Sequence, residues 1–188
     1  MPETTTPRIQ LLLAHPFPHR SRVNTALLEG VRNMPGVEVN DLYDRYPDFH
    51  IDIKREQDRL RETDLLVIQH PFYWYAAPAM FKQWQDTVLE YGFAFGTEGK
   101  ALHGKDWLTV VTVGQSREAY LPDGHNRYSV DELLRPYECS ANHCGMNYLE
   151  PIIICGTNKL SDADLDQWVN VYRERLRNYR PGQGGDNG

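Results

Sequence analysis

The chain has 188 residues, of which 40% are hydrophobic and 24% charged, and this profile excludes collagen-like, disordered and disulfide-scaffold proteins. Twenty-six acidic against 20 basic side chains give a net charge of -6, which lacks the basic footprint of a nucleic-acid-binding protein. The longest aliphatic runs, residues 11–14 and 152–155, are far shorter than the ~20 residues that span a bilayer. Because residues 1–8 carry no secretory signal pattern, we expect a cytoplasmic protein.

Short apolar runs alternate with amphipathic segments, which predicts a parallel sheet covered by helices on both faces. Five runs are nearly continuous in apolar residues, as expected for strands that are buried on both sides. They are residues 9–14, 37–42, 65–70, 107–113 and 152–156. Since no G-x-G-x-x-G follows the first strand, we predict an α/β, flavodoxin-like three-layer sandwich with a five-stranded parallel sheet. Ligands should then bind at the carboxyl ends of the strands.

Helix signals fill the gaps between these strands. Ser21 can cap the first helix and Pro78 can start another, while a charged helix is expected at residues 54–62. Further signals are the capping-box pairs Ser129 with Glu132 and Ser161 with Asp164, a helix start or break at Pro136, and a helix end at Gly145. We therefore predict one domain over residues 8–179, with disordered ends at residues 1–7 and 180–188.

The first candidate site lies between the opening strand and its helix, at residues 15–24. Free N–H groups at the helix start, the Ser21 hydroxyl, the Asn24 amide and His15 could together hold a phosphate. The alternative is that Ser21 only caps the helix and His15 only fills a turn. The position at the carboxyl end of a strand favours the phosphate site.

The second candidate follows the third strand, where four aromatic residues stand in a row from Phe72 to Tyr75. They cannot all point into a core, and in a loop they could form an apolar wall for a flat conjugated ring. Alternatively, two of them pack inward and two lie on a dimer interface. The third candidate follows the fourth strand, where Thr112 can donate its hydroxyl and Gly114 allows close approach of a ligand. Together the three loops would line one crevice that matches flavin mononucleotide.

No metal site is expected. Cys139, Cys144 and Cys155 match neither a C-x-x-C motif nor a zinc ribbon. Cys139, His143 and Cys144 could resemble ligands, but they stand at a predicted helix end, where core packing and capping explain them.

A long signature runs from residues 70–75 through Pro78, Lys82, Trp84 and Asp86 to residues 92–96. With it, the chain resembles the flavodoxin-like NAD(P)H:quinone oxidoreductases, the family that includes DT-diaphorase and the modulator of drug activity. Residues 41–53, followed by Glu56 and Gln57, are similar to the ancillary proteins of glutathione-gated potassium efflux systems. Those are cytoplasmic flavoproteins that sit as dimers on the regulatory domains of a membrane transporter.

This resemblance implies three sets of flavin contacts. The phosphate and ribityl end would be held by His15, Ser21, Arg22, Val23 and Asn24. The isoalloxazine ring would lie against Phe72, Tyr73, Trp74 and Tyr75. The cradle would be completed by Thr112, Val113, Gly114 and Gln115. The expected cofactor is FMN rather than FAD, because the chain has no obvious extra element for an adenosine moiety.

The resemblance also implies catalytic residues. Tyr120 matches a tyrosine that, together with a histidine, helps to accommodate charge on the reduced ring in DT-diaphorase. His125 is the candidate for the histidine, but it lies one position short of the pattern, and Asn126 stands at that position. Gln115 replaces a glycine that is common in the family's turn, which could narrow the pocket.

The leading hypothesis is an FMN-dependent NAD(P)H:quinone oxidoreductase. In it the flavin takes a hydride from NAD(P)H and then passes the two electrons to a quinone. A second is a regulatory subunit of a potassium efflux transporter, with the flavin structural or absent. A third is a one-electron carrier of the flavodoxin type. A homodimer is expected from the resemblance, with the aromatic loop and residues 93–95 as contact surfaces.

Overall fold

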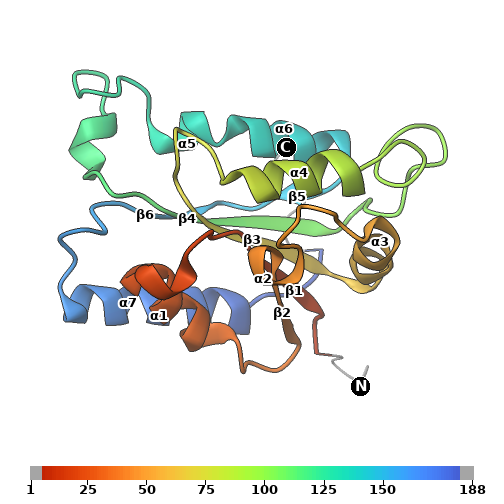
Figure 1. The fold of residues 1–188 in the computed structure, drawn as a ribbon, viewed down its shortest axis with the longest axis horizontal. Coiled ribbons are helices and arrows are strands. Elements are labelled where there is room, and N and C mark those ends of the chain that lie inside the picture. The colour runs from red at the N-terminus through yellow and green to blue at the C-terminus, as the bar shows by residue number, and fades with distance from the viewer. Residues whose placement is uncertain (1–5, 183–188) are drawn as a thin grey trace.

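The computed structural model describes residues 6–182 (Figure 1). The strands are β1 (Ile9–Leu13), β2 (Val37–Asp41), β3 (Leu65–Pro71), β4 (Asp106–Thr112), β5 (Asn147–Tyr148) and β6 (Ile152–Ile154). They form one parallel sheet in the order β2, β1, β3, β4 and β5, with β6 also paired to β4, so their carboxyl ends lie at one edge. This is the flavodoxin-like order, so the predicted fold is confirmed. Of the ends predicted to be disordered, residues 1–7 and 180–188, residues 1–5 and 183–188 lie outside the described residues.

The last strand position differs from the sequence prediction in one respect. The run at residues 152–156 forms β6, but the same side of β4 also pairs with β5, which the sequence did not indicate. Three residues separate the two short strands, and the third is Pro151, which has no N–H group to donate to the ladder. The edge of the sheet is therefore made of two short pieces.

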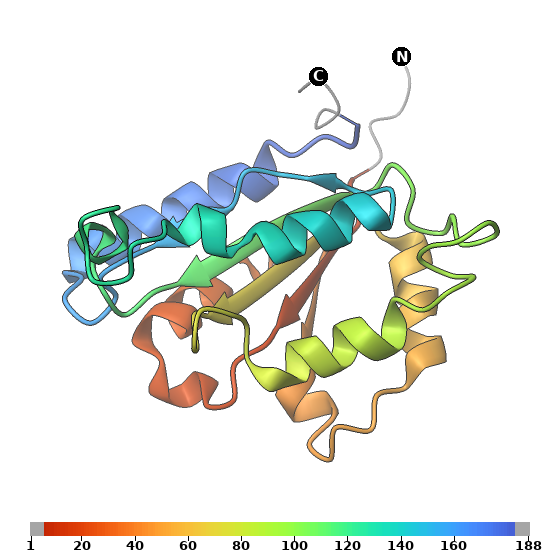
Figure 2. The ribbon, with the colours of Figure 1, turned by 90° about the horizontal axis from the view of Figure 1, so that it is seen from above.

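Two layers of helices cover the sheet (Figures 1 and 2). The helices are α1 (Arg22–Val31), α2 (Leu42–Arg45), α3 (Ile53–Glu62), α4 (Ala79–Val88), α5 (Val130–Leu133), α6 (Arg135–His143) and α7 (Asp162–Arg177). Short 3-10 turns are η1 (Pro18–Arg20) and η2 (Arg117–Tyr120). α1 and α7 pack on one face of the sheet, and α4 and α6 pack on the other. Covering both faces explains why β1, β3 and β4 are buried throughout.

The helix ends follow the local signals in the sequence. Ser21 caps α1 by accepting a hydrogen bond from the Asn24 N–H, and Ser129 and Ser161 each form a complete capping box. Pro136 lies in the first turn of α6, so it begins a new helix. These starts are predictable because each depends on residues that are at most three positions apart.

A buried carboxylate joins α3 and α4 to the edge of the sheet. Glu56 of α3 is 1% exposed, and its oxygens accept hydrogen bonds from Asn40 Nδ2, Tyr46 Oη and Trp84 Nε1, each at 2.8 Å. Arg59 also donates to Glu56, at 3.2 Å. One side chain thus joins β2, the end of α2, α3 and α4.

Candidate functional site

Loops from four strand ends meet at the carboxyl edge of the sheet, next to the point between β1 and β3 where the strand order reverses (Figure 2). They enclose a cavity of about 630 Å³, within the range of small-molecule sites. Its lining is His15, Phe17, Arg20, Ser21, Arg22, Val23, Asn24, Pro71, Phe72, Tyr73, Thr112, Gly114, Thr157 and Asn158. The structure therefore brings together residues from all three segments that the sequence singled out.

Thr157 and Asn158 also line the cavity and were not predicted from the sequence. Both follow the carboxyl end of β6, and Thr157 N–H donates to the Val113 carbonyl at 3.1 Å. The rule that placed the other three loops at this edge applies to the fifth strand as well. Applying it to residues 155–159 would have found this side of the cavity.

The start of α1 presents hydrogen-bond donors to the cavity. Ser21 Oγ accepts from the backbone N–H and from Nδ2 of Asn24, both at 3.2 Å, so the hydroxyl proton is left for another acceptor. The N–H groups of Arg22 and Val23 are in the first turn, where a helix offers them no carbonyl partner. The helix dipole adds partial positive charge at the same place, which favours an anion.

His15 supplies a further donor. The residue is 4% exposed, and burial, aided by the charge of His19, lowers the pKa of the imidazole below its usual value. Its Nδ1 accepts a hydrogen bond from the Phe17 N–H at 3.0 Å. In the neutral ring Nε2 must then carry the proton and can donate it to an oxygen of a ligand.

The Arg22 side chain is engaged elsewhere. Its guanidinium group binds the Asp162 carboxylate at 2.5 Å and also donates to the Leu160 carbonyl. This contact ties the start of α1 to the start of α7 and neutralises the guanidinium charge. Arg22 therefore offers the cavity its main-chain N–H rather than a free positive charge.

The aromatic residues form a tight hairpin beside this cradle. Tyr73 and Ala76 exchange two backbone hydrogen bonds, at 2.9 and 3.1 Å, around Trp74 and Tyr75. The two central residues have φ angles of 49° and 64°, a left-handed conformation that such turns usually assign to Asn and Gly. Holding bulky residues there costs on the order of 1–3 kcal/mol each, and strain of this kind is typical of functional loops.

The hairpin exposes its aromatic side chains instead of burying them. Trp74 is 93% exposed, Tyr73 and Tyr75 are also exposed, and Phe72 is half-buried. The Phe72 ring packs against Tyr75 and Tyr120, with centroid distances of 6.3 and 6.2 Å. Its N–H donates to the Thr112 carbonyl at 2.8 Å, which anchors the hairpin to the end of β4. The loop thus presents a wall of rings beside the polar cradle.

The end of β4 and the residues after it contribute Thr112 and Gly114 to the main cavity. Thr112 Oγ1 accepts a hydrogen bond from Asn24 Nδ2 at 2.8 Å, and Gly114 lines the cavity. A Cβ atom on Gly114 would lie 3.3 Å from Asn158 Nδ2, so a larger residue would press on this wall. Val113, which was also expected at the flavin, has its side chain buried in the core, and its N–H donates to the Ile154 carbonyl at 2.8 Å.

A smaller hollow of about 280 Å³ adjoins the main cavity. It is lined by Phe72, Trp74, Tyr75, Gly114, Gln115, Tyr120, Asn126 and Asn158. Tyr120 is almost fully buried, and burial raises the pKa of its phenol above the usual value. The Tyr120 hydroxyl therefore keeps its proton at neutral pH and can donate a hydrogen bond.

Asn126, and not His125, faces this hollow. Tyr75 Oη donates to Asn126 Oδ1 at 3.1 Å, and Asn126 Nδ2 donates to Gln115 Oε1 at 2.6 Å. The Asn126 N–H binds the Ala119 carbonyl at 2.8 Å, which fixes the loop against η2. His125 is exposed and is not part of the lining. The assignment of a catalytic role to His125 therefore has no support in the geometry.

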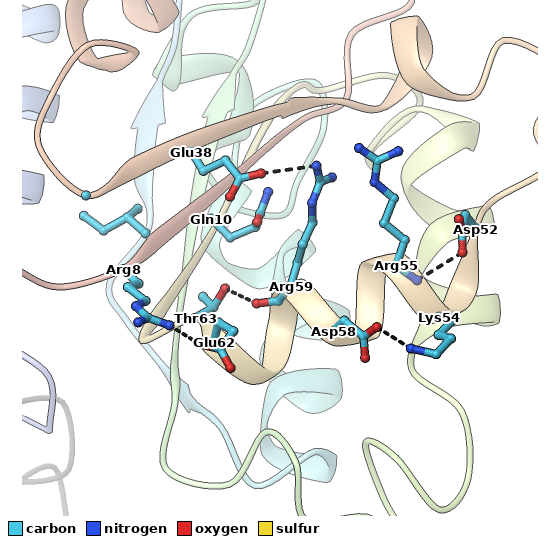
Figure 3. Close-up of a pocket in the computed structure, with 12 residues that line it drawn as sticks. Arg8, Gln10, Glu38, Asp52, Lys54, Arg55, Asp58, Arg59, Glu62 and Thr63 are labelled. Carbon is cyan, nitrogen blue, oxygen red and sulfur yellow. Dashed lines mark hydrogen bonds and ion pairs between the residues drawn. The ribbon is translucent and has the colours of Figure 1, made fainter.

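A second cavity, of about 600 Å³, lies beside α3 and the amino-terminal end of β1 (Figure 3). Three of its four cations pair with carboxylates: Arg59 binds Glu38 at 3.2 Å, Lys54 binds Asp58 at 2.6 Å, and Arg8 binds Glu62. Among the described residues, this cavity therefore offers the guanidinium of Arg55 as its free cation, whereas the cradle at α1 brings several main-chain and side-chain donors together.

His70 is buried near the end of β3, and its burial should make the stability of the protein sensitive to acid. The ring is fully buried, Nδ1 lies 2.9 Å from the Pro71 carbonyl, and burial lowers the pKa to about 4. In the unfolded chain the His70 imidazole titrates near pH 6.5. Between pH 6.5 and 4 the unfolded chain therefore binds a proton at this ring that the native protein does not bind. Stability should therefore fall as the pH falls through this window, by about 3 kcal/mol in all.

Urea unfolding at pH 7 and pH 5 measures this effect. The wild-type protein should lose about 2 kcal/mol from this group between the two pH values. His70→Gln removes the titrating ring and keeps a donor toward the Pro71 carbonyl, so its loss should be smaller by that amount. Equal losses in the two proteins would show that His70 does not control the acid sensitivity.

The donor-lined cradle at a helix start and the exposed aromatic hairpin lie at the switch point of a parallel sheet, which is where ligands bind in open α/β folds. Among residues 6–182 no group of three or more His, Cys, Asp or Glu side chains is placed to hold a metal ion. None of the helices in this part of the chain has the length and apolar character to cross a bilayer. The chain belongs to the flavodoxin-like fold family, whose model matches residues 7–176.

The related proteins carry names of three kinds. The chain is 46% identical to the glutathione-regulated potassium-efflux system ancillary protein KefG of Pectobacterium carotovorum. The 175 aligned residues cover 93% of this chain and 96% of the relative. The structure of general stress protein 14 from Treponema denticola in complex with FMN has a TM-score of 0.87 and 35% identity, covering 91% and 98% of the two chains. That of an NADPH-quinone reductase from P. pentosaceus has a TM-score of 0.84 and 28% identity, covering 92% and 99%.

Proposed function

We propose that the protein is an FMN-dependent NAD(P)H:quinone oxidoreductase that performs two-electron transfer to quinones. The observation that carries the proposal is the convergence of a donor-lined cradle and an aromatic hairpin on one crevice. The related structures named as an FMN complex and as an NADPH-quinone reductase support it. FMN, when bound, would supply the redox chemistry by accepting a hydride from NAD(P)H and reducing the quinone.

The residues present fit the two ends of this cofactor. Ser21 Oγ, His15 Nε2 and the first N–H groups of α1 are all donors, which suits a phosphate that only accepts hydrogen bonds. Nearby, Phe72 to Tyr75 offer a flat apolar wall for a conjugated ring. FAD fits less well, since residues 6–182 form no obvious extra element to hold an adenosine moiety.

The chain's own contribution would be placement and exclusion of water. The rings of Trp74 and Tyr75 would cover one side of the crevice, so that donor and acceptor occupy the same small hollow in turn. The Tyr120 hydroxyl, whose pKa is raised by burial, would donate a hydrogen bond to a developing negative charge. Asn126 would hold Tyr75 and Gln115 in register without titrating near neutral pH.

An absorbance spectrum of the purified protein, followed by anaerobic titration with NADPH, tests the proposal. A flavin spectrum that bleaches on titration and returns on addition of a quinone is the expected result. Protein that has no flavin spectrum and gains no nicotinamide oxidation when FMN and a quinone are supplied would overturn it.

Replacing Tyr73 and Trp74 together by alanine should strongly reduce flavin retention. The double variant removes two of the rings that form the wall, and stacking on an aromatic ring contributes on the order of 1 kcal/mol or more per contact. The flavin-to-protein absorbance ratio after gel filtration measures the effect. Tyr91→Ala, which removes an exposed ring outside both hollows, is the matched control. Unchanged flavin content in the double variant would refute the stacking role.

A regulatory role is the second candidate, and the KefG names of relatives that cover almost the whole chain favour it. In this case the protein would act on a potassium efflux transporter, with the flavin structural or absent. A homodimer is proposed for either role. Of the expected dimer surfaces, the aromatic hairpin is exposed, whereas Phe93 and Ala94 are buried and can contribute little. Co-purification with a potassium efflux transporter, retained in a variant without flavin, would support this role.

A further inference from the structure

A buried glutamine lies directly beneath the cradle and contacts Asn24 without lining the cavity. Gln69 is in β3 and is fully buried. Its Nε2 donates to the main-chain carbonyl of Asn24 at 3.0 Å and to Asn24 Oδ1 at 3.3 Å. Its Oε1 has no hydrogen-bond partner. A buried polar group with one side left unsatisfied calls for an explanation.

The contact decides how the Asn24 amide is oriented. Because Oδ1 accepts from Gln69, Nδ2 is turned the other way, toward Ser21 Oγ at 3.2 Å and Thr112 Oγ1 at 2.8 Å. The reversed amide would place two N–H groups against each other at Gln69 and leave an oxygen at both hydroxyls. Gln69 therefore selects one of the two possible orientations.

The orientation of Asn24 in turn decides what the two hydroxyls can do. A hydroxyl group has a single proton, and an oxygen that accepts from Asn24 Nδ2 keeps that proton for a different partner. Ser21 and Thr112 both line the main cavity, so both are left as donors toward a ligand. With the reversed amide, each hydroxyl would instead donate to Asn24 and present lone pairs to the ligand.

We infer that Gln69 is a positioning residue that makes the cradle donate hydrogen bonds and so gives it preference for a phosphate monoester over the uncharged alcohol. This inference rests on the proposed binding of FMN. Gln69 acts through Asn24, Ser21 and Thr112 and is not part of the cavity lining. The Oε1 atom of Gln69 remains without a hydrogen-bond partner, and we explain this unfavourable arrangement by the role of Gln69 in orienting the donors of the cradle.

The test compares FMN with riboflavin, which lacks the phosphate. Gln69→Met keeps a similar volume and removes the donor, and flavin fluorescence gives the Kd of each ligand. For Gln69→Met the Kd for FMN should rise by about 10-fold, the effect of weakening one or two hydrogen bonds to a charged group. The Kd for riboflavin should change by less than about 2-fold, because the ring contacts are untouched. A purely structural defect would weaken both ligands alike.

Two further variants make the result decisive. Gln69→Glu has no amide donor and should lower the preference for FMN as well, so it serves if Gln69→Met does not fold. Gln10→Met removes another buried glutamine, on β1 beside the second cavity, and should leave both Kd values unchanged (Figure 3). Thermal unfolding reports whether each variant is folded.

The outcomes separate this inference from the proposed function. Wild-type protein that binds FMN, with folded Gln69 variants that keep its preference for FMN over riboflavin, would overturn the positioning role alone. Loss of both ligands to the same extent would also overturn it. Wild-type protein that binds neither ligand would overturn the proposed function and this inference together.

Discussion

Asn24→Asp is expected to weaken FMN binding by about 100-fold or more. The substitution exchanges Nδ2, which donates to Ser21 Oγ and Thr112 Oγ1, for a carboxylate oxygen that accepts from both hydroxyls. Two donors are then turned away from the phosphate, and a negative charge is added beneath it. A hydrogen bond to a charged group contributes about 1.5–3 kcal/mol, so losing two gives a change of at least about 3 kcal/mol.

Titration of the apoprotein with FMN, followed by flavin fluorescence, measures this change. Asn170→Asp adds the same charge on an exposed position of α7 outside the main cavity and serves as the control, with an expected change in Kd of less than about 2-fold. Raising the salt concentration should not restore binding to Asn24→Asp, because residue 24 is buried and poorly screened. An unchanged Kd in the variant would mean that the phosphate is not held at the start of α1.

Features that depend on short-range signals were predictable from the sequence. Strands that are buried on both faces read as continuous apolar runs, and the serine caps depend on residues three positions apart. The rule that ligands bind at the carboxyl ends of parallel strands then placed three loops at one edge. The structure brings residues of these loops together around one cavity.

Features that depend on contacts between distant residues were not predictable in this way. Arg22 binds Asp162, which is 140 positions away, and no local pattern indicates that its guanidinium is engaged. The choice of Asn126 over His125 depends on how the loop folds back on Ala119. In contrast, the orientation of Val113 could have been inferred, because neighbouring strand residues face opposite sides and Thr112 faces the cavity.

Replacing Glu56 by leucine is expected to destabilise the protein by about 3–5 kcal/mol, which is a large part of the stability of an ordinary domain. The leucine removes the acceptor of three buried donors, Asn40 Nδ2, Tyr46 Oη and Trp84 Nε1. Each buried donor without a partner costs about 1–3 kcal/mol, since no water replaces the lost acceptor. The gain from burying an apolar side chain is smaller than this sum.

Urea unfolding followed by tryptophan fluorescence measures the loss, and Glu56→Gln should lie between leucine and wild type because it keeps one acceptor oxygen. Glu62→Leu, on an exposed position of the same helix, should change the free energy of unfolding by no more than about 0.5 kcal/mol. Because Glu56 joins β2, α3 and α4 away from the cradle, a folded Glu56→Gln protein should bind FMN as wild type does. A Glu56→Leu protein as stable as wild type would show that the carboxylate does not hold β2, α3 and α4 together.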